Sequence, residues 1–313
     1  MAANANIVFL GTAEFAVPIL QALIENDQKP VLVITRPDQP AGRKQLLQAP
    51  PVKPVARKAG IPVSQPERRQ PLDVLLRQAK PDVCILAAYG TLIKKETLAI
   101  PRFGFINIHP SLLPLYRGPA PVQNAILNGD EWSGVTVMLL DEQMDHGPTL
   151  AQEKLAVLPT DTAVTLTDRL AVLATDLMLR TLPDYLAGAL QPKAQDEARA
   201  TYTSIITRED GLIQWSKPAE AIERQFRAFL PWPGVYTHVQ GKRLKIVNLS
   251  VLEGNFKADG ALGTVFLADK KGLAVKCGQG AVCLGRVQVE GKKEMSAAEF
   301  LRGYPRCVGW VLM

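Results

Sequence analysis

The sequence has the composition of a globular protein that folds in water. Its 313 residues are 47% hydrophobic and 21% charged, which allows about two domains with substantial apolar cores. No uncharged apolar run approaches the roughly 18 residues of a membrane helix. The first residues, MAANANIVFLG, carry no basic n-region, so we expect no secretory signal, no membrane association and a cytoplasmic location.

The net charge of +6 is confined to the last third of the chain. Residues 1–203 carry 20 basic and 20 acidic side chains, whereas residues 204–313 carry 16 basic and 10 acidic ones. This asymmetry is typical of a module that binds a polyanion, although a merely solubilising surface would look similar.

The cysteines and histidines give no pattern of metal ligands. Four cysteines are present without C-x-x-C spacing, and none of the three histidines lies at ligand spacing from them. We therefore expect reduced, structural thiols and no metal site.

The first half of the chain alternates apolar strands with amphipathic helices. The run KPDVCILAAYG is continuous, as in parallel strands that are buried on both faces. The pattern predicts an α/β fold with a Rossmann-like doubly wound sheet. Strands are expected at residues 6–11, 29–35, 80–90, 103–109 and 134–141, and helices at 17–25, 121–129 and 160–186.

The turn after the first strand argues against a dinucleotide cofactor. It reads LGTAEF and holds one glycine, where a dinucleotide-binding turn holds three. The fold class therefore carries no expectation of NAD binding.

The last third predicts a small β-rich module. A helix with Ser216 as its N-cap carries an apolar stripe, and Ser296 with Glu299 predicts a capping box on a later helix. Between them lie five short strand-like runs, most of them separated by glycines, which favour an OB-type β-barrel. The stripe consists of Ile222, Phe226 and Phe229.

These patterns divide the chain into three segments. We expect an α/β catalytic domain at residues 1–189, a polar linker at 190–208 and a basic OB-like domain at 209–313. Trp215 and Trp232 are expected to pack within the last of these rather than to stack on bases.

The stretch INIHPSLLPLYRG, residues 106–118, places two polar side chains at the end of a buried strand. Asn107 and His109 project to the same side, because side chains alternate faces along a strand. The carboxyl ends of strands in open α/β sheets are where ligands bind. An amide and an imidazole aimed at one point would stabilise negative charge on a carbonyl oxygen.

A carboxylate beside this imidazole would favour its charged form. The loop LLDEQMDHGP follows another predicted strand and offers Asp141, Glu142 and Asp145 as candidates. The spacing does not choose among them.

The motif N-x-H-P-S-L-L-P-x-Y-R-G, with D-x-G beginning 27 residues after its glycine, resembles the signature of the folate-dependent formyltransferases. The resemblance implies transfer of a formyl group from 10-formyltetrahydrofolate to an amine, with Asn107, His109 and Asp145 as the catalytic residues. It also implies that the folate is bound by Ser111, Leu112, Leu113, Pro114 and Tyr89.

Within this family, nearly the whole chain is similar to the members that act on methionyl-tRNA. Residues 35–53 resemble their tRNA-contacting loop, which implies that Arg43 and Lys44 bind tRNA. The segments IQWS, FLPWPG and GKKEMSAAEFL resemble their OB-type C-terminal domain. The implied partners are the initiator methionyl-tRNA and 10-formyltetrahydrofolate, the implied product is N-formylmethionyl-tRNA for translation initiation, and we expect a monomer.

Two rival functions stay open. A formyltransferase for a small amine, such as a glycinamide nucleotide or an amino sugar, would need neither the loop at 35–53 nor a basic C-terminal domain. A non-catalytic RNA-binding protein would explain the charge but not an intact Asn-His-Asp set. Arg117 fits a structural ion pair as well as a substrate contact.

Overall fold

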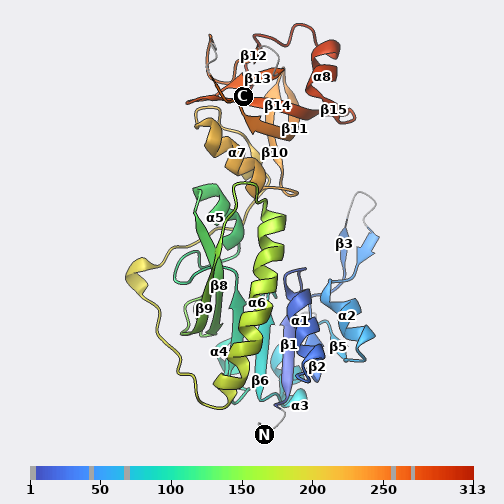
Figure 1. Ribbon diagram of the computed structural model, residues 1–313. Helices are drawn as coiled ribbons and strands as arrows, with labels where there is room; N and C mark the ends of the chain where they lie inside the picture. Colours follow the sequence, from blue (N-terminus) through green and yellow to red (C-terminus); the bar gives the residue numbers. More distant parts are fainter. Residues whose placement is uncertain (1–4, 42–45, 67–70, 255–258, 269–271) are drawn as a thin grey trace. The chain divides into compact units, whose positions relative to one another are not determined.

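The chain folds as two units in the computed structural model (Figure 1), which describes residues 5–41, 46–66, 71–254, 259–268 and 272–313. The first unit comprises Met1–Val122, Glu131–Ala156 and Thr165–Ser204. The second comprises Gln123–Asp130, Val157–Val164 and Ile205–Met313. The predicted domain boundaries stay predictions.

A seven-stranded sheet organises the first unit, in the order β5-β2-β1-β6-β7-β8-β9. The five strands from β5 to β7 are parallel, as predicted, and β8 and β9 run antiparallel to their neighbours. The sheet consists of β1 (Ile7–Gly11), β2 (Leu32–Ile34), β5 (Val63–Ser64), β6 (Val83–Ala87), β7 (Phe105–His109), β8 (Trp132–Leu139) and β9 (Thr149–Ala156).

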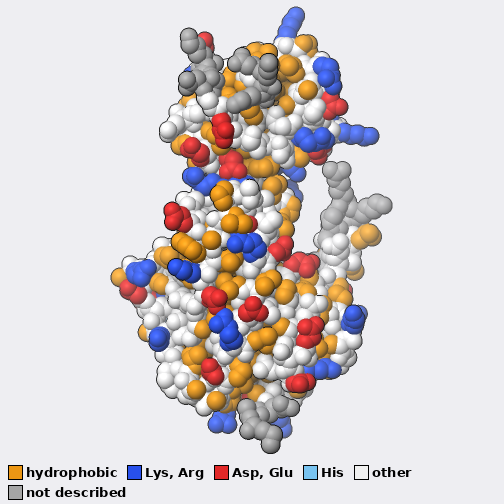
Figure 2. Space-filling model, in the orientation of Figure 1, with side chains coloured by type: hydrophobic (Ala, Val, Ile, Leu, Met, Phe, Trp, Pro, Cys, Tyr) orange, Lys and Arg blue, Asp and Glu red, His pale blue; other side chains and the backbone are white. Residues whose placement is uncertain are grey.

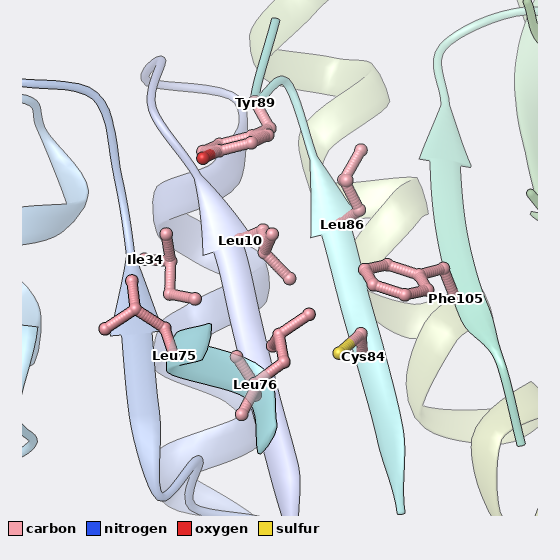
Figure 3. Packing of buried hydrophobic residues seen from close by; sticks show 9 residues of the cluster. Leu10, Ile34, Leu75, Leu76, Cys84, Leu86, Tyr89 and Phe105 are labelled. Carbon is pink, nitrogen blue, oxygen red and sulfur yellow. The ribbon is translucent and has the colours of Figure 1, made fainter. Parts of the chain in front are cut away.

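Helices cover both faces of this sheet, so the doubly wound α/β prediction is confirmed. Figures 1 and 3 place α1 and α6 on one face and α3 on the other. On the α3 face, Leu75 and Leu76 pack with strand residues in the buried cluster of Figure 3. The helices up to residue 186 are α1 (Ala16–Glu25), α2 (Val52–Lys58), α3 (Leu72–Ala79), α4 (Lys95–Leu98), α5 (Pro121–Asn128) and α6 (Ala163–Leu186). Most of α5 belongs to the second unit.

Gly11 explains the single glycine of the first turn. A Cβ atom at this position would lie 2.9 Å from the Cβ of Ala16 and 3.2 Å from the Ala87 carbonyl oxygen. The glycine therefore allows β1, α1 and β6 to approach closely, a role that requires no dinucleotide.

An antiparallel sheet organises the second unit, with strand order β10-β11-β14-β13-β12 and β15 beside β14. Figure 2 shows Lys and Arg side chains on the drawn face of this unit, interspersed with Asp and Glu. The elements are α7 (Ala219–Ala228), β10 (Val235–Val239), β11 (Lys242–Val251), β12 (Val265–Leu267), β13 (Leu273–Lys276), β14 (Ala281–Val289), β15 (Met295–Ser296) and α8 (Ala297–Gly303).

The last residues of the chain curl this sheet toward a barrel. The Met313 backbone exchanges hydrogen bonds of 2.7 and 3.0 Å with His238 of β10. On the other side, the Trp310 carbonyl accepts a 2.8 Å hydrogen bond from Val265 of β12. Residues 310–313 thus lie between the two outer strands, in agreement with the predicted OB-type architecture.

The predictions for the helices of this unit were partly correct. The stripe of α7 is buried and the capping box of Ser296 and Glu299 is present. Ser216 is not the N-cap of α7, because the helix begins at Ala219. The Ala219 amide donates to the Gln279 carbonyl instead. Trp215 is buried as expected, whereas Trp232 is 54% exposed.

The remaining segments are 3-10 turns and a short hairpin, namely β3 (Gln39–Ala41), β4 (Leu46–Gln48), η1 (Glu197–Arg199) and η2 (Glu209–Gly211). The four cysteines form no disulfide with each other, and burial raises the pKa of the Cys277 thiol to about 11. None of the helices in the described ranges is long and apolar enough to span a bilayer.

Candidate active site

Strand β7 delivers an amide and an imidazole to the carboxyl edge of the first sheet. Asn107 and His109 are buried, with 6% and 5% of their surfaces exposed. In the sheet, Asn107 is paired with Leu86 of β6 and His109 with Thr136 of β8. Both side chains are therefore held where the parallel part of the sheet meets its antiparallel part.

Asp145 is the carboxylate that reaches these two side chains. Asn107, His109 and Asp145 are here called the corner. Its Oδ1 accepts a hydrogen bond of 3.2 Å from the Asn107 amide, and its Oδ2 lies 3.6 Å from Nδ1 of His109. Asp141 instead pairs with His146, and Glu142 pairs with Lys95. The geometry thus selects one of the three carboxylates that the sequence left open.

Both nitrogens of His109 face groups that only accept hydrogen bonds. Nε2 lies 3.0 Å from the carbonyl oxygen of Tyr116, and Nδ1 faces the Asp145 carboxylate. A carbonyl or an ionised carboxylate offers no proton. The imidazole is therefore held between a backbone carbonyl and a carboxylate.

The signature loop after β7 is fixed by two side chains that sequence reasoning missed. Thr136 of β8 donates to the Ser111 carbonyl (2.7 Å) and accepts from the Leu113 amide (3.1 Å). Gln152 of β9 donates to the Leu113 carbonyl at 2.7 Å. The available signal was a polar Thr136 inside the apolar run GVTVML, which marks a buried hydroxyl that requires partners.

Arg117 forms a structural ion pair with Glu197, which favours this role over the substrate contact that the sequence left open. The residue is 1% exposed, and its guanidinium donates to Glu197 (3.0 Å) and to the Gln195 side chain (2.9 Å). The next residue, Gly118, has φ +111°, and a Cβ there would lie 2.7 Å from the Thr203 carbonyl oxygen. The Gly118 amide donates a hydrogen bond of 2.8 Å to Asp145 Oδ2. The turn at Gly118 therefore also helps to hold the Asp145 carboxylate.

Comparisons with known families agree with this arrangement. Residues 5–182 match the model of the formyl transferase family, and residues 205–305 match that of the formyl transferase C-terminal domain. The chain belongs to the formyl transferase family.

Its relatives in this family match over almost their whole length. The methionyl-tRNA formyltransferase of Roseiflexus castenholzii is 46% identical over 95% of this chain and 95% of the relative. That of Myxococcus xanthus is 43% identical over 97% of this chain and 96% of the relative. Among solved structures, HypX from Aquifex aeolicus in complex with tetrahydrofolic acid has a TM-score of 0.63 at 18% identity, over 98% of this chain and 48% of HypX. This last likeness concerns the fold alone.

The residues expected to bind folate in this formyl transferase differ in burial. Ser111, Leu113 and Tyr89 are buried, whereas Leu112 and Pro114 are partly exposed. Tyr89 belongs to the apolar cluster of Figure 3, where its ring lies above Leu10, and burial raises the pKa of its hydroxyl. These side chains lie after β6 and β7, which are adjacent strands.

Arg43 and Lys44, expected to bind tRNA, lie outside the described residues. The base of their loop is described: Nζ of the buried Lys53 donates to Asp38 at 2.7 Å, and Gln65 donates to the same carboxylate at 2.7 Å. The hydrogen bonds from Lys53 and Gln65 lower the pKa of Asp38.

No group of three or more metal-ligating side chains occurs among the residues that the structure describes. At the corner of this formyl transferase, the Asn107 amide, the His109 imidazole and the Gly118 amide surround the Asp145 carboxylate.

Proposed function

We propose that this protein transfers the formyl group of 10-formyltetrahydrofolate to the free α-amino group of the initiator methionyl-tRNA, and that it does so as a cytoplasmic monomer. The product is N-formylmethionyl-tRNA for translation initiation. The observation that carries the proposal is the contact of Asn107 and His109 with one carboxylate, Asp145. The acceptor is suggested by relatives of that name that match almost end to end.

The amine requires little activation. An α-amino group titrates near pH 7.7–8.0, so a substantial fraction is already a neutral nucleophile near neutral pH. Its attack on the formyl carbon places negative charge on the formyl oxygen, and the bond to the folate nitrogen then breaks. The site must stabilise that oxyanion and carry the proton from the amine to the departing nitrogen.

The corner supplies groups for both tasks. The Asn107 amide has two hydrogens, and Asp145 accepts one of them, so a second donor on the same nitrogen can serve an oxyanion. His109 adds an imidazole at the same edge, and with Asp145 it offers a relay for the proton. One oxyanion donor contributes about 2.7–4 kcal/mol to transition-state stabilisation.

The proposed folate contacts follow β6 and β7, two adjacent strands of the first sheet. The folate is held by the loop of Ser111, Leu112, Leu113 and Pro114 and by Tyr89. Arg43 and Lys44 contact the tRNA, together with the basic second unit. Both basic residues lie in the sequence between Asp38 and Lys53, whose side chains form an ion pair.

Assays with three different amine acceptors test which one the protein formylates. The purified protein receives 10-formyltetrahydrofolate together with methionyl-tRNA, a glycinamide nucleotide or an amino-sugar nucleotide, and formylated product is measured. We expect transfer to methionyl-tRNA with a kcat/KM at least about a hundredfold above either small amine. Preference for a small amine would assign the protein to another formyltransferase activity, and absence of transfer to any acceptor would reject catalysis.

The monomer proposal has a separate test. Light scattering coupled to size exclusion should give a mass near 34.1 kDa. A mass near twice that value would reject it.

A further inference from the structure

The segment of residues 193–203, here called the strap, is attached to the first unit by its backbone. Lys193 exchanges two hydrogen bonds of 2.8 Å with Thr149 at the start of β9. At the other end, Thr203 donates to the Arg117 carbonyl at 2.8 Å, and the Arg117 amide donates to Thr201 at 2.9 Å. The sequence predicted a linker here, yet the described backbone is paired at both ends.

Gln195, in the middle of the strap, contacts the backbone of the loop that carries Asp145. Its Nε2 donates to the carbonyl oxygens of Asp145 and Gly147, at 2.8 Å each. Its Oε1 accepts from Arg117 Nε at 3.2 Å and from the terminal nitrogen at 2.9 Å. Carbonyls only accept and a guanidinium only donates, so these four contacts fix which way the amide points.

The loop requires such support because its conformation is unfavourable by itself. Asp145 has φ +49°, a left-handed conformation that side chains other than glycine seldom adopt. Such conformations persist only where the surroundings impose them. In this conformation the carboxylate faces Asn107, His109 and the Gly118 amide at once.

We propose that Gln195 is a positioning residue for formyl transfer. It holds the backbone of residues 145–147 so that the Asp145 carboxylate remains beside His109, and the buried Arg117 in turn holds Gln195. This inference rests on the proposed function. It assigns this role to Gln195 alone among the strap residues, and no strap residue contacts Asn107 or His109 in the described contacts.

Two substitutions separate the contacts of Gln195. Gln195→Met removes all four, whereas Gln195→Glu retains an acceptor for Arg117 and replaces the donor with an oxygen that repels both carbonyls. We expect both variants to lower kcat about 10- to 100-fold, because small displacements of a catalytic group have effects of that size. The KM values for both substrates should change less than about threefold, since the residue contacts neither.

The matched control is Asp196→Ala on the same strap. Asp196 caps the turn η1 through the Ala198 amide and contacts neither Arg117 nor the Asp145 loop in the described contacts. This variant should retain the wild-type kcat. An equal loss of kcat in all three variants would overturn the proposal in favour of general strap stability.

A double-mutant cycle with Asp145→Ala provides the decisive readout. If Gln195 acts through Asp145, then Gln195→Met should have no further effect on kcat in the Asp145→Ala background. Independent, multiplying losses would overturn the proposal.

Amide hydrogen exchange tests the same proposal without catalysis. Faster exchange at residues 145–147 in Gln195→Met would support it, and unchanged exchange would overturn it. A wild-type protein that transfers no formyl group would instead reject the proposed function, so the two failures are distinguishable.

Discussion

The two units of the chain use charge in opposite ways. In the first unit the chemically important groups gather in one buried corner and bond to each other, as Asn107, His109 and Asp145 do. In the second unit the excess positive charge lies on exposed side chains such as Lys242 and Lys293. The first arrangement depends on geometry and the second on net charge.

This difference follows from what each region must recognise. Charge that develops on one oxygen atom is stabilised only by donors held at hydrogen-bond distance. A polyanion is attracted by positive charge spread over a surface, and that attraction weakens with added salt. Substitutions in the first unit should therefore change kcat, and ionic strength should act on the binding of tRNA.

Of the substitutions in the first unit, Asn107→Ala should have the largest effect on kcat. It removes one proposed oxyanion donor and should lower kcat about 100- to 1,000-fold while the folate still binds. Single-turnover formyl transfer measures the chemical step. Asn26→Ala, which removes an exposed amide after α1, is the control and should be silent. A loss below about tenfold for Asn107→Ala would contradict the oxyanion role.

Added salt should weaken the binding of methionyl-tRNA. If about five phosphates are contacted, a slope near −0.7 per contact weakens tRNA binding about 50-fold when the salt concentration is tripled. Arg43→Ala should reduce the slope by about one contact. The measurement is KM for methionyl-tRNA against salt concentration. A flat dependence in the wild type would argue against the proposed acceptor.

Thr136→Val tests how much the loop after β7 depends on its hydrogen bonds to Thr136 of β8. The substitution leaves the Leu113 amide without its buried partner, which should cost about 1–3 kcal/mol in the free energy of unfolding. Thr175→Val, which removes one hydroxyl bond to a helix carbonyl on α6, should cost less. Urea denaturation compares the two variants. Equal losses would show that the signature loop does not rely on Thr136.

Acid should loosen the strap by protonating Glu197. The hydrogen bond from Arg117 lowers the pKa of Glu197 in the folded protein. The stabilisation is therefore complete above about pH 4.5, the ordinary value, and is lost as the pH falls through the lowered pKa. Exchange protection of the Thr201 and Thr203 amides should fall in that range. Glu197→Gln should abolish the pH dependence, and a wild type with constant protection would contradict the prediction.

Much of the fold and the core of the site could be predicted because the signals are local. Continuous apolar runs predicted β1, β6 and β7, and the register of β7 placed Asn107 and His109 together. Strand β9 was missed, because its sequence, TLAQEKLA, mixes charged and small residues on a partly exposed strand. Asp145 could be proposed only as one of three carboxylates, since loop conformation decides which one reaches the corner.

The contacts that complete the site could not be predicted. The strap binds through polar side chains and backbone groups, so it has no apolar periodicity and resembles a linker. Gln195 and Asp145 are 50 residues apart in the sequence, and no local pattern connects them. Arg117 shows the same difficulty, because its partners Gln195 and Glu197 lie 78 and 80 residues away.

The distance between Gln195 and Asp145 also has a consequence for synthesis on the ribosome. The 50 residues between them take about 3 to 10 seconds to translate at ordinary rates. Through that interval the nascent chain holds β7 and the Asp145 loop without the amide that secures the loop. The corner is therefore completed late, after the strands of its sheet have been made and before residues 205–313 are translated.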